Sequence, residues 1–355
     1  MNRTFHTQLC AGGPNFVDNE KGKGINMVKF RLRELAVSHG KKVVENEVYL
    51  EHFRKRGKEV EHFLKDVIGR DKRYMFEDES GSTLTLSLEA AHELLHKTGL
   101  TGADIDMIIL SSQLPEYTAP PTSIKIHAAI GGKKECICYD VNSNCCGMAL
   151  ALEQAAKYMA LTPHVNRTLL IGCDYINMMI NEEEENLYGH YGDAACAVIV
   201  EKTEEDSGLV DSVCTVKSEG VDVALFPGCG FSNIFRVENK ADMLIDFTPP
   251  TEDVPESATE SIQTLLTRNG LTKDDISMFC FSQYALINIR KIRELMDIKE
   301  ENSLYIGYEY GYTGTSSPFI TLYESMERGM VKRGDYIIIW TIGCGSQNIG
   351  LLCKL

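Results

Sequence analysis

The feature that most constrains the fold of this chain is an internal repeat at an offset of 171 residues. Residues 99–111 (GLTGADIDMIILS) lie over residues 270–282 (GLTKDDISMFCFS), with Gly, Leu, Thr, Asp, Ile, Met and the final Ser identical. Each copy has the pattern of an amphipathic helix, a Gly stop, an Asp-led turn and a buried strand. Identities kept at one offset indicate duplication of an α/β unit.

Cys145 lies in the first copy, where a strand-like run at residues 136–141 turns into a helix-like run at residues 148–156. A tight strand–helix elbow presents a nucleophile, and the positive end of a helix dipole favours the thiolate. The alternative is one buried structural cysteine among twelve. The offset carries Cys145 onto Ser316, so we expect two elbows that face each other across a shared pocket.

Composition excludes several classes of protein. The net charge of −15 argues against nucleic acid or an anionic membrane as a partner. No apolar stretch approaches the roughly 18 residues of a membrane span, and residues 1–8 lack the apolar core of a signal peptide, so we expect a cytoplasmic protein. The cysteines are expected to be free thiols, because the chain is long and shows no secretion signal. C-x-C-x6-C-C at residues 136–146 is not a usual zinc spacing and no His follows at ligand distance, so we expect no metal.

Strand-like and helix-like segments alternate along the chain, which predicts a layered α/β fold. We divide it into an N-terminal arm (1–26), a first half with the nucleophile (27–201), a connection with a substrate-side insertion (202–256) and a second half (257–355).

From about residue 28 to its end the chain resembles the ketoacyl-ACP synthase III branch of the thiolase-like superfamily. Residues 140–148 (DVNSNCCGM) are similar to that family's Asp-Val-x-x-x-Cys-Ala-Gly-Phe, and residues 191–197 (YGDAACA) to its Phe-Gly-Asp-Gly-Ala-Gly-Ala. Residues 342–345 (IGCG), followed by Gly350, look like its Gly-rich terminal strand.

The resemblance implies a thiolase fold, in which two five-stranded sheets and three helical layers form an α-β-α-β-α sandwich. It also implies an acyl group carried on Cys145, with the N–H groups of Cys145 and Cys344 as the oxyanion hole. The substrate would be an acyl-CoA or acyl-carrier-protein thioester, with no tightly bound cofactor. A homodimer is expected, and a heterodimer stays open.

The chain departs from the family at the two residues that assist decarboxylation. The family's His position holds Ser282, and its Asn position holds Tyr312. One oxyanion donor contributes about 2.7–4 kcal/mol, so losing two would slow decarboxylation by roughly four to six orders of magnitude. Both hydroxyls can donate a hydrogen bond, but neither is a base near neutrality. Acyl transfer to Cys145 needs neither partner.

Two further positions bear on the chemistry of the pocket. His190 stands where the family usually has an apolar residue of the substrate tunnel, so it is a candidate base, or else a packed histidine. Ala119 falls where the family often closes the acyl pocket across the dimer. A small residue there favours a medium or long acyl group, unless it is only a loop residue.

Residues 63–70 lack a match for the tryptophan and arginine that clasp coenzyme A in the family, which favours a carrier-protein donor. Arg70 remains a candidate contact for the donor. Arg290 and Lys291, with Arg293, form a basic cluster that can dock an acidic carrier protein. The alternative is that these residues form an ordinary solvated helix face.

We therefore predict an acyltransferase that loads Cys145 and passes the acyl group to a second nucleophile without decarboxylation, in fatty acid, other lipid or specialised-metabolite biosynthesis. The alternatives are a decarboxylating condensing enzyme with altered second-step residues, and a subunit of a heteromeric ketosynthase pair.

Overall fold

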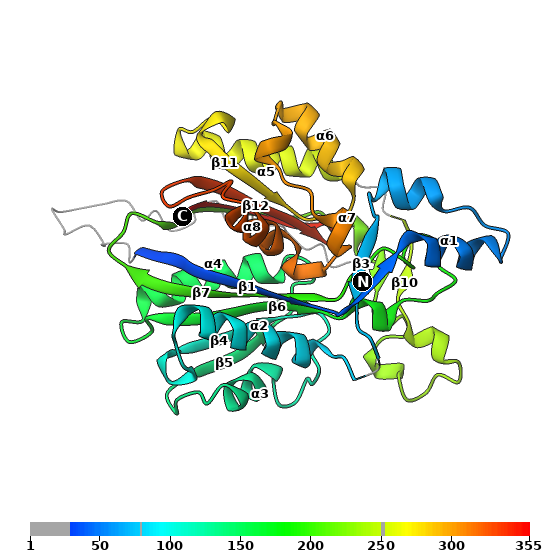
Figure 1. Ribbon diagram of the computed structural model, residues 1–355, viewed down its shortest axis with the longest axis horizontal. Helices are drawn as coiled ribbons and strands as arrows, with labels where there is room; N and C mark the ends of the chain where they lie inside the picture. The colour runs from blue at the N-terminus through cyan, green and yellow to red at the C-terminus, as the bar shows by residue number, and fades with distance from the viewer. Residues whose placement is uncertain (1–28, 79, 250–252) are drawn as a thin grey trace, which may run out of the picture.

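The computed structural model describes residues 29–78, 80–249 and 253–355. The candidate N-terminal arm, 1–26, lies outside these residues. Two sheets and three helical layers alternate, as Figure 1 shows, with one pair of helices enclosed between the sheets. The predicted α-β-α-β-α architecture is confirmed.

The first sheet has the strand order β1-β7-β6-β4-β5, and β4 runs parallel to both of its neighbours. All five residues of β4 are buried, which is typical of a central parallel strand covered on both faces. The strands are β1 (Lys29–His39), β4 (Met107–Ser111), β5 (Ile137–Val141), β6 (Arg167–Asp174) and β7 (Ala194–Thr203).

The second sheet has the order β11-β12-β13-β8. Its strands are β8 (Gly208–Val216), β11 (Ile276–Phe281), β12 (Tyr336–Gly343) and β13 (Gln347–Lys354). The expectation of five strands in each sheet is wrong for this half within the described residues. At the repeat offset, the counterpart of β5 is residues 308–312, where the chain forms the end of the short helix α7 (Gly307–Tyr310) instead.

β8 pairs with β13 along its length, so residues 208–216 belong to the second half rather than to a connection. The second half therefore begins before residue 257. What remains between β8 and α5 is a segment of short turns with the two-stranded pair β9 (Ala224–Leu225) and β10 (Asp246–Phe247).

Helices cover both sheets. The outer layers are α2 (Thr83–Thr98) and α3 (Thr122–Ala129) on one side, and α5 (Val254–Asn269) and α6 (Leu286–Met296) on the other; α4 (Gly147–Leu161) and α8 (Ser317–Glu327) lie between the sheets. At one end of the molecule, α1 (Asn46–Arg54) lies beside the antiparallel pair of β2 (Lys42–Glu45) and β3 (Lys72–Met75), within the segment that connects them. Among the described helices, none combines the length and the apolar composition needed to cross a membrane.

The structure confirms the duplication. α2 and α5 span equivalent residues at the offset of 171, and each ends at a left-handed glycine, Gly99 (φ 68°) and Gly270 (φ 64°). The next turn repeats its capping contacts, because Asp104 accepts from Thr101 as Asp275 does from Thr272. Local rules of helix termination therefore act twice on the same sequence pattern.

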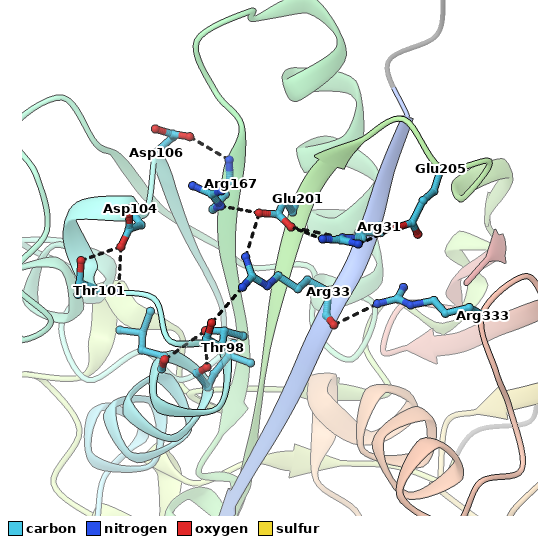
Figure 2. Close-up of polar contacts among 12 residues, drawn as sticks. Arg31, Arg33, Thr98, Thr101, Asp104, Asp106, Arg167, Glu201, Glu205 and Arg333 are labelled. Atoms are coloured by element: carbon cyan, nitrogen blue, oxygen red, sulfur yellow. Dashed lines mark hydrogen bonds and ion pairs between the residues drawn. The ribbon is translucent and has the colours of Figure 1, made fainter.

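A cluster of arginines on one carboxylate stabilises the first sheet (Figure 2). The side chain of Glu201 on β7 is 8% exposed and accepts from Arg31 and Arg33 on β1 and from Arg167 on β6. Burial opposes ionisation of Glu201, but the hydrogen bonds from Arg167 and Arg31 hold its pKa below the usual value. Arg333 donates to two carbonyl groups of β1 and so joins the halves.

Candidate active site

The two elbows of the repeat contact each other directly, rather than across a pocket as predicted. The Thr315 hydroxyl accepts from the Met148 N–H at 2.7 Å, and so caps the first turn of α4. It also bonds the Ser111 hydroxyl at 2.9 Å. Ser316, the counterpart of Cys145, is buried and donates to the carbonyl oxygen of Thr313 at 2.9 Å. The second elbow thus supports the helix that presents Cys145.

Cys145 opens onto a cavity of about 320 Å³ between the halves. The size is at the low end of small-molecule sites, roughly 300–1,000 Å³. One wall is apolar and comes from the segment between β8 and α5: Val223, Ala224, Leu225, Phe226, Ile245 and Phe247. The polar wall is formed by Gln113, Asn142, Asn144, Tyr191, Tyr284, Tyr312 and the turn 343–346. Cys145 and the predicted substrate-side insertion, residues 202–256, therefore line the same cavity.

Tyr312 and Ser282 lie at Cys145 as predicted from their sequence positions. The Tyr312 hydroxyl donates a hydrogen bond to the Cys145 sulfur, and the Ser282 hydroxyl donates to the Tyr312 oxygen at 3.3 Å. Ser282 directly follows β11, and Tyr312 lies before the second elbow. The structure brings these three residues together from both halves of the duplication.

The surroundings of Cys145 oppose ionisation of its thiol. Burial raises the pKa of the Cys145 thiol well above its usual value, the nearby Cys344 adds to this, and the hydrogen bond from Tyr312 acts in the opposite direction. The direction of this shift favours the thiol, whereas the N-terminus of α4 favours the thiolate.

Cys344 lies in the turn between β12 and β13 and lines the cavity. The backbone of this turn approaches the nucleophile closely: a Cβ placed on Gly343 would lie 3.4 Å from the Cys145 nitrogen. The Cys344 N–H donates to the Oδ1 of Asn144 at 3.0 Å. The Cys344 N–H, the predicted second donor of the oxyanion hole, thus lies at the site and is hydrogen-bonded to the Asn144 side chain.

His190 is not placed as a base. It is 1% exposed, does not line the cavity, and its Nε2 and Nδ1 face the carbonyl oxygens of Tyr284 (2.8 Å) and Asn186 (3.4 Å). Burial and the nearby Arg70 lower the pKa of His190 to about 3. The histidine is instead a packed residue that holds the backbone of Tyr284.

Arg70 is likewise not a substrate contact. It is fully buried, and its guanidinium donates to the carbonyl oxygens of Ile68, His190, Gln283 and Tyr284 and to the Tyr305 hydroxyl. Burial lowers the pKa of Arg70. Because every bond goes to the protein itself, Arg70 positions the chain behind the tyrosines of the cavity.

Two of the three basic side chains on α6 are paired with other groups of the protein, so the cluster presents less free positive charge than its sequence suggests. Lys291 pairs with Glu294, and Arg293 turns inward to the Ser303 carbonyl and pairs with Glu300. Arg290 lines a separate hollow with Lys65 and Tyr308. Carrier docking by Arg290 and Lys291 stays a prediction. Ala119 is exposed and does not line the cavity of the single chain, so its effect on acyl length also stays a prediction.

Sequence reasoning missed a second group of residues around Cys145. Asp174 at the end of β6 is buried and accepts from the Thr315 and Gln113 N–H groups (3.0 and 2.8 Å), which joins the second elbow to the segment after β4. Asn144 has a left-handed backbone (φ 53°), a conformation for which Asn is enriched. An Asn directly before the candidate nucleophile was therefore the sequence signal that could have predicted this left-handed turn.

Comparisons with known proteins match segments in both halves of the chain. The family model "3-Oxoacyl-[acyl-carrier-protein (ACP)] synthase III" matches residues 139–218, and its C-terminal counterpart matches residues 266–355. A beta-ketoacyl-[acyl-carrier-protein] synthase III of Clostridium perfringens is 28% identical over 320 residues, 89% of this chain and 96% of the relative. The beta-ketoacyl-[acyl-carrier-protein] synthase III 2 of Bacteroides thetaiotaomicron is 25% identical over 78% of this chain and 83% of the relative.

A solved structure, the 3-oxoacyl-[acyl-carrier-protein] synthase III of Aquifex aeolicus, has the same fold, with a TM-score of 0.81 and 21% identity. It covers 92% of this chain and 100% of the other. With both family models in order and a cysteine at the strand–helix elbow, the chain is a divergent member of the ketoacyl-ACP synthase III branch of the thiolase-like superfamily, and thus an acyltransferase.

Proposed function

We propose that the protein loads an acyl group onto Cys145 and transfers it to a second nucleophile without decarboxylation. The single observation that carries the proposal is the arrangement of hydroxyl groups around Cys145. Tyr312 donates to the sulfur and Ser282 donates to Tyr312, so both replacements serve the nucleophile.

Transfer of the acyl group to Cys145 needs no external base. The Cys145 sulfur forms a bond to the thioester carbonyl carbon, the bond from that carbon to the donor's sulfur breaks, and the Cys145 proton ends on the departing thiolate. The Tyr312 hydrogen bond stabilises the developing negative charge on Cys145, and so does the N-terminus of α4, which begins at Gly147.

Decarboxylation makes a different demand on the site. Loss of CO2 from a malonyl thioester leaves an enolate, whose oxygen needs hydrogen-bond donors aimed at it. The Tyr312 hydroxyl is directed at the Cys145 sulfur, and the Ser282 hydroxyl is directed at the Tyr312 oxygen. Their orientation favours the first half-reaction over the decarboxylating one.

The acceptor is proposed from the residues of the cavity. Among the described residues that line it, none is His, Asp, Glu or Lys. An alcohol would need a base to become nucleophilic, whereas a thiol or an amine reaches its reactive form closer to neutral pH. We therefore assign the acceptor to the thiols or amines.

The donor is proposed to be an acyl-CoA or acyl-carrier-protein thioester, in lipid or specialised-metabolite biosynthesis. The relatives are named as synthases of acyl-carrier-protein substrates. The apolar wall from Val223 to Phe226 suits a hydrocarbon chain.

A decarboxylating condensing enzyme is the second candidate. Tyr312 supplies a hydroxyl donor next to Cys145, and rotation of that hydroxyl toward the cavity would give an enolate one of its two donors.

Intact mass spectrometry after incubation with acyl-CoA and acyl-carrier thioesters tests the proposal. We expect one acyl adduct on the wild-type chain and none on Cys145→Ala, with no CO2 released from malonyl thioester. Rapid CO2 release would replace the proposal by the second candidate. Loading that appears only after a homologous chain is added would indicate a subunit of a heteromeric pair.

A further inference from the structure

The side chain of Asn144, the residue before Cys145, accepts the hydrogen bond of the Cys344 N–H, which is the predicted second donor of the oxyanion hole. Its Oδ1 accepts from the Cys344 N–H at 3.0 Å, and its Nδ2 donates to the Gln113 Oε1 at 2.7 Å. Asn144 lines the same cavity as Cys145. A side-chain amide therefore lies across the predicted oxyanion hole.

The orientation of the Asn144 amide is fixed by the two groups that it bonds, the Cys344 N–H and the Gln113 side chain. The Cys344 N–H is only a donor, so it must meet the oxygen of Asn144. At the other end, Gln113 donates from its Nε2 to the buried Asp174 at 3.3 Å, so its oxygen is the atom left for the Asn144 amide. Both amides are thus held in one orientation by groups that cannot reverse their roles.

The Cys344 N–H is a single donor, and the Asn144 Oδ1 is already its acceptor. The two segments are in close contact here, because a Cβ on Gly343 would lie 3.0 Å from the Asn144 Oδ1. The carbonyl oxygen of a thioester that reacts with Cys145 must take the place of the Oδ1 at the Cys344 N–H.

We propose that Asn144 is a positioning residue that keeps the oxyanion hole closed until an acyl thioester displaces its amide, which limits loading to donors that bind well enough to open it. The inference rests on the proposed function, because it concerns the loading of Cys145. Gln113 and Asp174 hold the amide in the closed position.

The test compares two reactions of the same sulfur. Acylation by an acyl-CoA needs the oxyanion hole, whereas alkylation by iodoacetamide needs only the thiolate. In Asn144→Gly, which also suits the left-handed backbone, we expect single-turnover acylation to rise about 2- to 12-fold, the factor of one neutral hydrogen bond. Alkylation of Cys145 should stay unchanged.

Three further variants separate this effect from a loosened loop. Asn144→Ala also lacks the acceptor, and Gln113→Leu removes the anchor of the amide, so both should raise the ratio of acylation to alkylation. Ser143→Ala, at a residue that does not line the cavity, removes the bond from the Ser143 hydroxyl to the Gln347 Oε1 at 3.0 Å but leaves the Cys344 N–H covered, so its ratio should equal that of the wild type.

The outcomes are distinct. Slower or unchanged acylation in Asn144→Gly, with normal alkylation, overturns the inference and would make the Asn144 amide an aid to the reaction. A wild-type chain and variants that alkylate normally but never acylate overturn the proposed function and this inference with it.

Discussion

The Tyr312 hydroxyl donates a hydrogen bond to the sulfur of Cys145, and the two residues come from opposite halves of a duplicated fold. Each is buried, and each sits at or just before one of the two elbows that the repeat creates. The nucleophile is therefore supported by a side chain that a single copy of the repeat does not contain.

Tyr312→Phe should slow the loading of Cys145. The variant keeps the ring but loses the hydrogen bond, which raises the pKa of Cys145 further and leaves the forming thiolate less stable. We expect single-turnover acylation at pH 7 to fall roughly 2- to 12-fold, as for one hydrogen bond. Tyr284→Phe, which removes another phenol of the cavity, is the control and should change the rate less.

The pH dependence of alkylation should reveal the raised pKa of Cys145. Since burial raises the pKa above the usual value of about 8.5, the thiolate fraction should increase about tenfold per pH unit from pH 7 to pH 9 without a plateau. The measurement is the rate of iodoacetamide labelling at Cys145, followed by peptide mass spectrometry. A plateau below pH 8 would contradict the structure.

Restoration of the family's residues should create decarboxylation. Ser282→His combined with Tyr312→Asn places two donors at the positions that face Cys145. We expect CO2 release from malonyl thioester to rise by at least tenfold over the wild type, since each donor contributes about 2.7–4 kcal/mol to the transition state. No rise, in a folded double variant, would show that these positions do not correspond to the family's pair.

His190→Gln should leave the chemistry intact and change acid stability. The folded pKa of about 3 lies below the usual value of about 6.5, so the unfolded chain takes up the proton first and the wild type loses stability as pH falls below about 6.5. The variant lacks this loss. Its free energy of unfolding relative to wild type should improve from pH 7 to pH 4 in urea titrations, with an unchanged pH profile of acylation.

Glu201→Gln should destabilise the first sheet. The lowered pKa of Glu201 means that its stabilisation is present above about pH 4.3 and is lost as pH falls through the folded pKa. We expect a loss of about 1–3 kcal/mol at pH 7, because the partly exposed arginines keep some solvation. The difference should shrink below pH 4. Glu205→Gln, whose side chain is half exposed, should cost about 0–1 kcal/mol.

Much of the fold follows from local patterns. Left-handed glycines at 99 and 270 and the Thr–Asp turns after them depend on neighbours within a few residues, so they repeat wherever the sequence repeats. The same holds for the Cys145 elbow. The lack of a fifth strand in the second sheet, within the described residues, was not predictable in this way, because residues 308–312 form the end of a short helix instead of the strand that the repeat predicts.

The sequence by itself determined the duplication, the candidate nucleophile Cys145 and the replacement of the family's His and Asn by Ser282 and Tyr312, since these depend on residue identity and spacing. Only the tertiary structure decided the direction of each polar side chain. Arg70 and His190 have the chemistry of ligands and bases, yet carbonyl groups from distant segments bury and saturate them. Asn144 covers the Cys344 N–H for the same reason: its partner lies 200 residues away in the chain.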